Sequence, residues 1–425
     1  MAKKYYFISD LHIGGDGPLN ECEFEPELII FLKKLEKERD VELIIVGDTF
    51  GFWEISKLEN SNKLKYVLNT HKKLFNQFKK TGAKIKITII PGNHDHELVC
   101  NKKYKFLLKK YNINLESKQY IIRSVAGKKI WIEHGSQQDE PTSFIPFDDK
   151  NYKPLGFHVA QKLLIGAGKS SEVAKRPWIK DVESVTPDEA VPHWLFSNYF
   201  YKEMSPLLRY FLLPFILMLT LSFLILLFLV LQQFGVFPGV SIYGPILKLG
   251  LVGRAIMVII TIDIILIIFL LLISVPLYLL IRDFKKALIR YHVIGDEGVK
   301  RNKYNTVIDY TRKLFKKNGV DIFVTAHTHN VSLEKIGKKV LINTGTWLKR
   351  MRRIKNRFKY LPDIYYPSYE LSYFKIYAHK NKVAIEYCKM PKKIKDLMLT
   401  PLERSLIVLR SKNVKPTKIP DITYV

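Results

Sequence analysis

The apolar residues in the first part of the chain recur with two different periods. Residues 5–9, 42–48 and 84–90 are short apolar runs that predict strands, and residues 25–39 and 63–80 have the spacing of amphipathic helices. Polar residues follow each predicted strand. This alternation of strand and helix predicts an α/β domain, in which ligands bind beyond the ends of the strands.

The same pattern continues after a long interruption. Strands are predicted at 119–125 and 128–133, and the pattern resumes with a helix at 303–318 and further strands at 321–326, 340–345, 371–377 and 382–388. Between these two parts, residues 141–206 are rich in Pro, Gly and aromatic residues. We interpret them as a cap or juxtamembrane insertion.

Two long apolar runs lie within the interruption. Residues 210–231 are uncharged, and residues 255–281 contain only Asp263 as a charge. At 1.5 Å per residue each run can cross a hydrocarbon core of about 30 Å, so we expect a transmembrane hairpin rather than buried helices of a soluble protein. Asp263 is costly if it faces lipid; it either pairs with a polar group, marks an oligomer contact or lies near the interface.

The charges beside the two runs predict how the hairpin is oriented. Eight Lys and Arg residues lie in the flanks 190–209 and 282–301, whereas the connecting loop holds only Lys248 and Arg254. By the positive-inside rule, both ends of the hairpin face the cytoplasm. We therefore expect a cell-membrane protein with two spans, with its catalytic domain and both termini in the cytoplasm.

These patterns together predict the domain boundaries. The expected parts are the first part of the α/β domain (1–140), the insertion (141–206), the hairpin (207–282), the second part of the α/β domain (283–390) and a basic C-terminal tail (391–425).

The composition narrows the classes of protein and of metal site that remain. The 425 residues carry 68 Lys and Arg against 40 Asp and Glu, a net charge of +28, and 47% are hydrophobic, which excludes a disordered basic tail. Residues 331–425 alone hold 22 basic and 7 acidic residues. The three cysteines are far apart, which argues against a disulfide framework and a thiolate metal site.

Residues able to bind metal follow five of the predicted strands. Their side chains are carboxylates, an amide and imidazoles, which suit Mn, Fe, Zn or Co, and we expect manganese first. Seven such ligands exceed what one ion needs, so a pair of divalent ions sharing one carboxylate is predicted, a centre that hydrolyses phosphate esters with activated water. The ligands are Asp10, His12, Asp48, Asn93, His134, His327 and His329.

The ordered series SDLH (9–12), GD (47–48), GNHD (92–95), EHG (133–135) and AHTH (326–329) resembles the calcineurin-like metallophosphoesterase superfamily. The resemblance covers about 1–140 and 300–350, and it implies a four-layer α/β/β/α sandwich, here interrupted by the hairpin. It also implies roles for the residues. Asp10, His12, Asp48 and His329 would bind one metal. Asp48, Asn93, His134 and His327 would bind the other. His94 would contact the phosphate and help the leaving oxygen depart, with Asp95 orienting its imidazole.

The sequence departs from the family's pattern at two informative positions. Many relatives have an acid three residues after the bridging aspartate, where this chain has Gly51. The segments FISDLHIGG and GDTFGFWE resemble the UDP-2,3-diacylglucosamine pyrophosphate hydrolases, which cleave a diphosphate on a membrane lipid, but that group typically has arginine where His94 stands. The resemblance therefore supports metal-dependent phosphoester hydrolysis more firmly than it supports this lipid diphosphate as the substrate.

A basic segment follows the last ligand. Residues 349–359 hold seven cations in eleven positions, and Arg350, Arg352 and Arg353 are candidate substrate-binding residues. The segment would attract a phosphorylated substrate or anionic lipid, or be a solvated positive-inside face. Nucleic acid is a less favoured partner, because aromatic residues are sparse there.

Three functions are compatible with these features. The first is a membrane-anchored phosphoesterase acting on a lipid-linked phosphate or diphosphate, with the lipid bilayer as its partner. The second applies the same chemistry to a soluble phosphodiester, nucleotide or phosphoprotein. The third is a non-catalytic membrane scaffold, which the complete set of ligand side chains disfavours.

Overall fold

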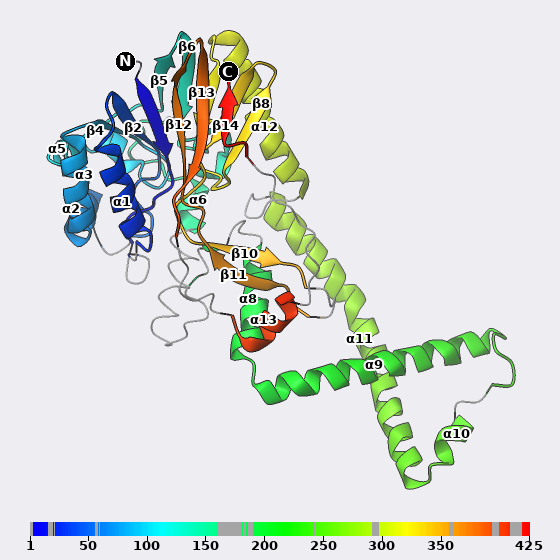
Figure 1. Cartoon of the computed structure of the whole chain (residues 1–425). Coiled ribbons are helices and arrows are strands. Elements are labelled where there is room, and N and C mark those ends of the chain that lie inside the picture. Colours follow the sequence, from blue (N-terminus) through cyan, green and yellow to red (C-terminus); the bar gives the residue numbers. More distant parts are fainter. Residues whose placement is uncertain are drawn as a thin grey trace. The chain divides into compact units, whose positions relative to one another are not determined.

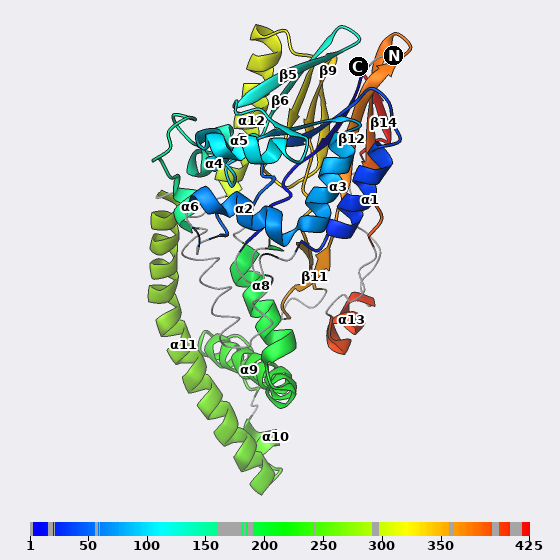
Figure 2. The same ribbon diagram turned by 90° about the vertical axis from the view of Figure 1, so that its left-hand side faces the viewer.

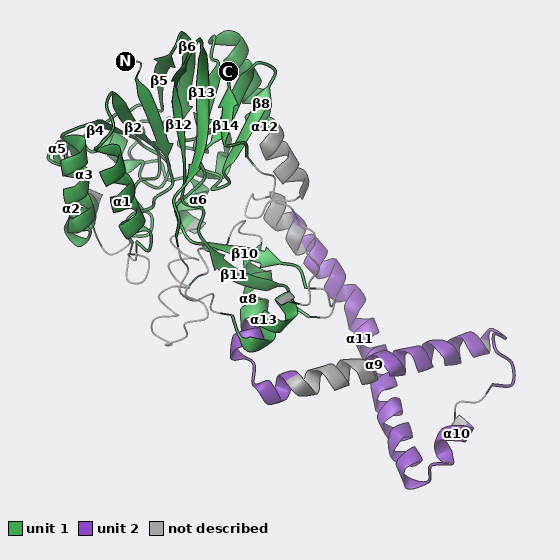
Figure 3. Ribbon diagram, in the orientation of Figure 1, with its two compact units in different colours: residues 1–198, 297–425 green, residues 199–296 purple. Residues whose placement is uncertain are grey.

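The computed structural model describes most of the chain. The described residues are 3–15, 20, 22–55, 58, 60–159, 181, 184–185, 190–240, 243–290, 297–356, 361–392, 399–408 and 419–425. The chain divides into two compact units, Met1–Asn198 with Glu297–Val425 and Tyr199–Asp296 (Figure 3). Each unit is described by itself below.

Unit 1 is built on two β-sheets. The larger has the strand order β14-β13-β12-β1-β2-β3-β4, and β1 to β4 run parallel while β12 is antiparallel to β1. Its strands are β1 (Lys4–Ile8), β2 (Val41–Val46), β3 (Lys86–Ile90), β4 (Ile113–Leu115), β12 (Ser372–His379), β13 (Lys382–Lys389) and β14 (Ile422–Tyr424).

The second sheet has five strands in the order β5-β6-β7-β9-β8. Its centre, β6, β7 and β9, is parallel, and each edge strand is antiparallel to its neighbour. The strands are β5 (Tyr120–Val125), β6 (Lys128–Glu133), β7 (Ile322–Thr325), β8 (Ser332–Ile336) and β9 (Lys339–Asn343). The pairing of β6 with β7 brings together segments that the interruption separates in sequence.

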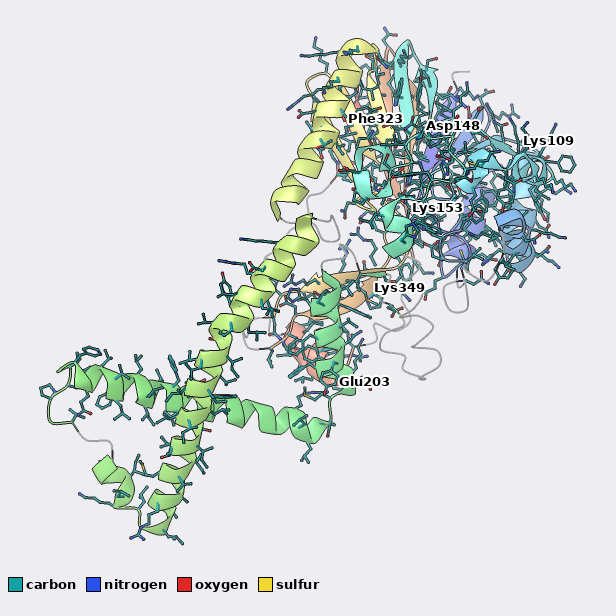
Figure 4. The ribbon with its side chains drawn as sticks, turned by 180° about the vertical axis from the view of Figure 1, so that it is seen from behind. Lys109, Asp148, Lys153, Glu203, Phe323 and Lys349 are labelled. Carbon is teal, nitrogen blue, oxygen red and sulfur yellow. The ribbon has the colours of Figure 1, made fainter. Side chains whose placement is uncertain are left out.

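Alternating side chains place these sheets in a sandwich with helices on both outer faces (Figures 1 and 2). Tyr5 and Phe7 of β1 point into a core shared by both sheets, whereas Tyr6 and Ile8 face a second core beneath helices. Helices α1 (Glu25–Leu35), α2 (Asn60–Thr70), α3 (Lys72–Gly82) and α5 (Lys102–Lys109) cover the larger sheet. Helix α12 (Glu297–Lys317) covers the smaller sheet, with buried Phe323 beneath it (Figure 4). The described residues thus form four α/β/β/α layers.

Several elements differ from the sequence-based expectation. The single helix predicted over 63–80 is broken into α2 and α3 at His71, whose ring nitrogens lie 2.9 Å from Glu25 Oε2 and 3.1 Å from Asn20 Oδ1. The end of the chain, predicted as a tail, contains helix α13 (Pro401–Val408) and contributes β14 to the larger sheet. The remaining positions of 391–425, namely 393–398 and 409–418, lie outside the described residues.

Short helices lie in the described part of the insertion and in the residues just before it. These are the 3-10 turns Ser136–Gln138 (η2) and Glu140–Thr142 (η3), and helices α6 (Leu155–Val159) and α8 (Val191–Asn198). Trp194 of α8 is buried against Met351 and Tyr365 of a two-stranded sheet, β10 (Arg350–Ile354) and β11 (Ile364–Ser368). Residues 160–180 of the predicted insertion lie outside the described residues, as do 357–359 of the basic segment.

Unit 2 contains two long helices, α9 (Pro206–Gln233) and α11 (Leu251–Arg290), with α10 (Tyr243–Leu247) between them. Among the described residues, Leu251–Asp283 is long and apolar enough to cross a membrane, and Leu219–Gln232 is a shorter apolar stretch. The two predicted spans are therefore matched by one such helix. The side chains of 210–218, which belong to the first predicted span, lie outside the described set. Asp263 pairs within the unit: its Oδ2 accepts a hydrogen bond from buried Ser222 Oγ at 3.0 Å.

Candidate metal centre

The predicted ligands lie on loops that leave the parallel strands of both sheets. Asp10 and His12 follow β1, Asp48 follows β2, and Asn93 follows β3, while His134 follows β6 and His327 and His329 follow β7. Five of these seven residues have a left-handed backbone, with φ of 48° at Asp10, 42° at His12, 48° at Asp48, 70° at His327 and 57° at His329. Such conformations are uncommon for residues with a side chain and cluster at functional sites.

Asp48 lies at the middle of the cluster. Its Oδ2 is 3.6 Å from His12 Nε2 and 3.1 Å from His134 Nε2, and its Oδ1 accepts a hydrogen bond from the His94 amide at 2.8 Å. Burial alone would raise the pKa of Asp48, but the imidazoles of His134 and His94 hold it well below the ordinary value. One carboxylate oxygen thus faces histidines from the loops of two different sheets.

The other ligands gather in two groups around Asp48. In the first, Asp10 Oδ1 lies 3.2 Å from His329 Nε2 and 4.0 Å from His12 Nε2. In the second, His134 Nε2 lies 3.1 Å from Asn93 Oδ1, and His134, Asp48 and His327 can offer ligand atoms within 4.8 Å of one another. The members of each group belong to one of the two ligand sets that the family resemblance implies; their binding of metal stays a prediction.

Buried atoms and close packing show that the cluster fits divalent cations. Asp10 Oδ1 and His12 Nε2 are buried and make no hydrogen bond with any described residue. Buried polar atoms normally have a partner, and a cation between the two would satisfy them both. A Cβ on Gly92 would lie 2.2 Å from Asp48 Oδ1, and one on Gly47 would lie 2.3 Å from His134 Nδ1, so glycine is needed for these close approaches.

The contacts of Asp95 differ from the prediction. Its Oδ2 accepts hydrogen bonds from the amides of Thr49 at 2.8 Å and Phe50 at 3.2 Å, and its Oδ1 accepts one from Gly92 at 2.6 Å. Burial and the neighbouring Asp48 raise the pKa of Asp95 to about 7. Asp95 therefore holds the loops after β2 and β3 together, which corrects the expectation that it orients the His94 ring.

The acid beside that ring is Glu54. Its Oε1 lies 2.7 Å from His94 Nδ1 and 3.6 Å from His12 Nδ1. Burial opposes its ionisation, but the charge of His94 and contacts with His12 keep the pKa of Glu54 below its ordinary value. Glu54 belongs to the GDTFGFWE segment. It was missed because many relatives have their acid at the position of Gly51, and Glu54 stands three positions further along the chain.

His327 has two side-chain partners near the start of the insertion that the sequence did not predict. Its Nε2 lies 3.1 Å from Asp139 Oδ2 and 3.2 Å from Thr142 Oγ1. Asp139 lies between the turns η2 and η3, and Thr142 is the last residue of η3, where the chain leaves the first part of the sandwich. Sequence gave no signal for them, because nothing in their spacing relates them to a histidine almost two hundred positions away.

The three candidate arginines have different surroundings. Arg350 donates hydrogen bonds to the His329 carbonyl oxygen at 2.8 Å and to Asn330 Oδ1 at 2.9 Å, so it supports a ligand loop. Arg352 Nη2 lies 3.5 Å from Glu370, and Arg353 Nη2 lies 2.5 Å from Asp363, and both arginine side chains are exposed. Their role toward a substrate stays a prediction.

Residues 3–210 match the family model for calcineurin-like phosphoesterases. The chain carries a calcineurin-like phosphoesterase domain. The match includes every predicted site residue up to His134 and ends before His327 and His329. The phosphoesterase domain acquires these last two histidines because β7 pairs in parallel with β6. The chain is therefore a hydrolase that acts on phosphoric ester bonds.

Solved structures similar to this phosphoesterase are distant. Vps29 of Entamoeba histolytica, complexed with Zn²⁺, is 11% identical, with 92% of this chain and 94% of that chain covered and a TM-score of 0.29. A predicted phosphoesterase of Streptococcus pneumoniae is 8% identical, with 94% of each chain covered and a TM-score of 0.27. Phosphopantetheinyl hydrolase of Mycobacterium tuberculosis is 10% identical, with 81% and 90% covered and a TM-score of 0.26. TM-scores this low support no inference about this chain. The sequence matches none of the curated proteins.

Proposed function

We propose that the chain is a membrane-anchored phosphoesterase that uses two divalent ions to hydrolyse a lipid-linked phosphate ester or diphosphate. The observation that carries the two-ion proposal is the position of Asp48 Oδ2, which faces His12 at 3.6 Å and His134 at 3.1 Å. A carboxylate that faces two imidazoles in this way is suited to bridge two ions. Mn²⁺ is our first choice, with Fe, Zn and Co as alternatives, because the ligands are oxygen and imidazole donors.

The residues divide the work of holding the ions. Asp10, His12, Asp48 and His329 would hold one ion, and Asp48, Asn93, His134 and His327 the other. When bound, two such ions supply positive charge and an activated water for in-line attack on phosphorus. The second group is fixed by its surroundings: His134 Nδ1 lies 2.9 Å from the Val46 carbonyl oxygen, which leaves Nε2 directed at Asp48.

His94 is placed to act on the substrate. Its side chain is 20% exposed, whereas Asp48 is 1% exposed, so the ring lies on the open side of the cluster. Burial would lower the pKa of His94, but Glu54 and Asp48 raise it above its ordinary value. A cationic His94 would bind a phosphate oxygen and donate a proton to the leaving oxygen.

The apolar helices support a lipid substrate and a membrane location. In the most apolar 18-residue window of Leu251–Asp283, only 17% of the residues are buried. A largely exposed apolar helix of this length is suited to a bilayer. A catalytic domain tethered to a membrane meets lipid headgroups at a high effective concentration.

The test uses the purified full-length chain in detergent. With Mn²⁺ added, hydrolysis of lipid diphosphates, nucleotide diesters and phosphopeptides is compared. We expect the highest kcat/KM on a lipid diphosphate and a loss of about 1,000-fold or more for Asp48→Asn, because the bridging carboxylate is removed. A preference for a water-soluble diester would refute the lipid proposal. Unchanged hydrolysis in Asp48→Asn together with loss of metal would refute the catalytic role of the centre.

A further inference from the structure

We propose that Glu54 is a positioning residue that holds the rings of His12 and His94 with a single carboxylate. The inference rests on the proposed function, since it names a further residue of the same site. Glu54 follows the loop after β2 and its side chain is 16% exposed, so it is mostly withdrawn from solvent. No predicted role accounts for a carboxylate at this point.

The contacts of Glu54 define what it does. Its Oε1 faces the same ring atom of both histidines, Nδ1, at 2.7 Å in His94 and 3.6 Å in His12. The two rings are 4.4 Å apart and nearly perpendicular, at 70°. A carboxylate at ion-pair distance from Nδ1 favours the proton on that nitrogen and so selects the tautomer of an imidazole.

Because Nδ1 of each ring faces Glu54, the opposite nitrogen of each ring is directed elsewhere. His12 Nε2 lies 3.6 Å from Asp48 Oδ2 and 4.0 Å from Asp10 Oδ1, among the other ligands of the first ion. His94 keeps Nε2 for the substrate. One side chain therefore couples a metal ligand to the residue that meets the phosphate.

The neighbouring residues keep this arrangement in place. Trp53 stacks on the His94 ring with centroids 4.2 Å apart at 30°, and Phe157 of the insertion packs against Trp53 at 5.7 Å. Gly51 provides the space for the carboxylate, because a Cβ there would lie 2.9 Å from Glu54 Oε2. Gly51 thus leaves room for the Glu54 carboxylate, and Trp53 supports the His94 ring that this carboxylate faces.

Asp95 does not compete for this role. Both of its oxygens accept hydrogen bonds from backbone amides, those of Thr49, Phe50 and Gly92. Of the two acids near the ring, Asp95 holds the backbone and Glu54 holds the imidazoles.

The test measures metal binding and turnover in Glu54→Gln, an isosteric change that removes the charge. The control is Glu97→Gln: Glu97 is also buried and close to the site in sequence, but its partner is Lys63 at 2.8 Å. Mn²⁺ affinity is measured by electron paramagnetic resonance on the metal-stripped full chain. We expect Glu54→Gln to weaken Mn²⁺ binding and to lower kcat on an aryl phosphodiester, each by about 10–100-fold, while Glu97→Gln changes neither by more than about threefold.

A double-mutant cycle separates positioning from a structural effect. If Glu54 acts on turnover through His94, adding Glu54→Gln to His94→Ala lowers kcat by less than about threefold further. Glu54→Asp, which keeps the charge but shortens the reach, should recover part of the lost turnover.

The results distinguish this inference from the proposed function. An active wild type in which Glu54→Gln behaves like Glu97→Gln, or in which Glu54→Gln and His94→Ala are additive, would overturn the role of Glu54. A wild type that binds Mn²⁺ but hydrolyses no substrate would refute the proposed function, while a weaker Mn²⁺ affinity in Glu54→Gln would still support the contact with His12.

Discussion

Gly92 sets the position of the central carboxylate. A Cβ at this residue would lie 2.2 Å from Asp48 Oδ1 and 2.5 Å from the Asp48 amide nitrogen. Gly92→Ala must therefore displace the bridging aspartate. Because displacements of about 1 Å at a reacting centre cost about 100-fold, we expect kcat to fall by at least that factor.

The matched control for Gly92→Ala is Gly127→Ala. Gly127 lies in the turn between β5 and β6, where a Cβ would meet nothing within 4 Å, although its φ of 76° makes the substitution locally strained. We expect Gly127→Ala to lower thermal stability slightly and leave kcat unchanged. Equal kcat in both variants would show that Gly92 does not set the geometry of the site.

At the scale of single residues, the sequence predicted ligands better than their supports. Asp10, His12 and Asp48 were recognisable because side chains directly after parallel strands meet at one sheet edge. The partner of His94 was assigned to its neighbour Asp95. Adjacent residues in a tight loop point in different directions. Asp95 accepts hydrogen bonds from the backbone amides of Thr49 and Phe50 rather than from the His94 ring.

Between elements, Glu42 links the two sheets through one carboxylate. It lies on β2 with its side chain fully buried, and Arg123 of β5 approaches it at 2.9 Å, as does Lys3. Burial alone would raise the pKa of Glu42, but these cations and Thr88 lower it to about 2 from 4.5. The carboxylate is thus stabilised more in the folded than in the unfolded chain.

This shift predicts how stability depends on pH. A lowered folded-state pKa adds stability that is fully present above the unfolded value near 4.5 and is lost as the pH falls toward 2, a contribution of about 3 kcal/mol. Glu42→Gln should therefore lower the melting temperature of the full chain strongly at pH 7 and less at pH 3.5. If the difference in melting temperature between the wild type and Glu42→Gln is as large at pH 3.5 as at pH 7, Glu42 stabilises the fold by packing alone.

The hydrogen bond between α9 and α11 is a second contact between elements. Ser222 and Asp263 are 2% and 7% exposed among otherwise apolar residues, with Oγ and Oδ2 3.0 Å apart. Ser222→Ala leaves the Asp263 side chain without this donor, which costs about 1 kcal/mol. We expect a lower melting temperature of the detergent-solubilised chain.

A double variant provides the control. Replacing both partners with apolar residues, Ser222→Ala with Asp263→Leu, removes the unpaired group as well, so its melting temperature should return close to that of the wild type. If the double variant is less stable than Ser222→Ala alone, Asp263 has a further partner, such as a second copy of the chain.

At the element scale, periodicity located the central strands well and the edges poorly. Strands β1, β2 and β3 were visible because each is a continuous apolar run buried on both faces. Strands β4, β8, β10, β11 and β14 were missed. In β10 the strand period cannot be recognised, because three of its five residues are the cations Arg350, Arg352 and Arg353. Arg352 and Arg353 form ion pairs with Glu370 and Asp363, which the sequence pattern does not indicate.

For the whole molecule, the uneven distribution of charge predicts topology. Lys248 and Arg254 are the basic residues of the 232–254 loop, whereas the flanks of the hairpin hold eight, two in 190–209 and six in 282–301. If the flanks are cytoplasmic, the loop is outside. The three native cysteines, Cys22, Cys100 and Cys388, belong to unit 1, so on this topology none is exposed outside the cell.

Cysteine labelling tests that topology in intact cells. A membrane-impermeant maleimide should leave the wild type unlabelled and should label Lys248→Cys, since residue 248 lies in the loop. After the membrane is permeabilised, labelling of the wild type should appear as well, because all three cysteines are partly exposed in unit 1. Labelling of the intact wild type would place unit 1 outside the cell. A Lys248→Cys variant that reacts only after permeabilisation, while fractionating with the membrane, would replace the two-span topology with one in which the loop stays on the side of the catalytic domain.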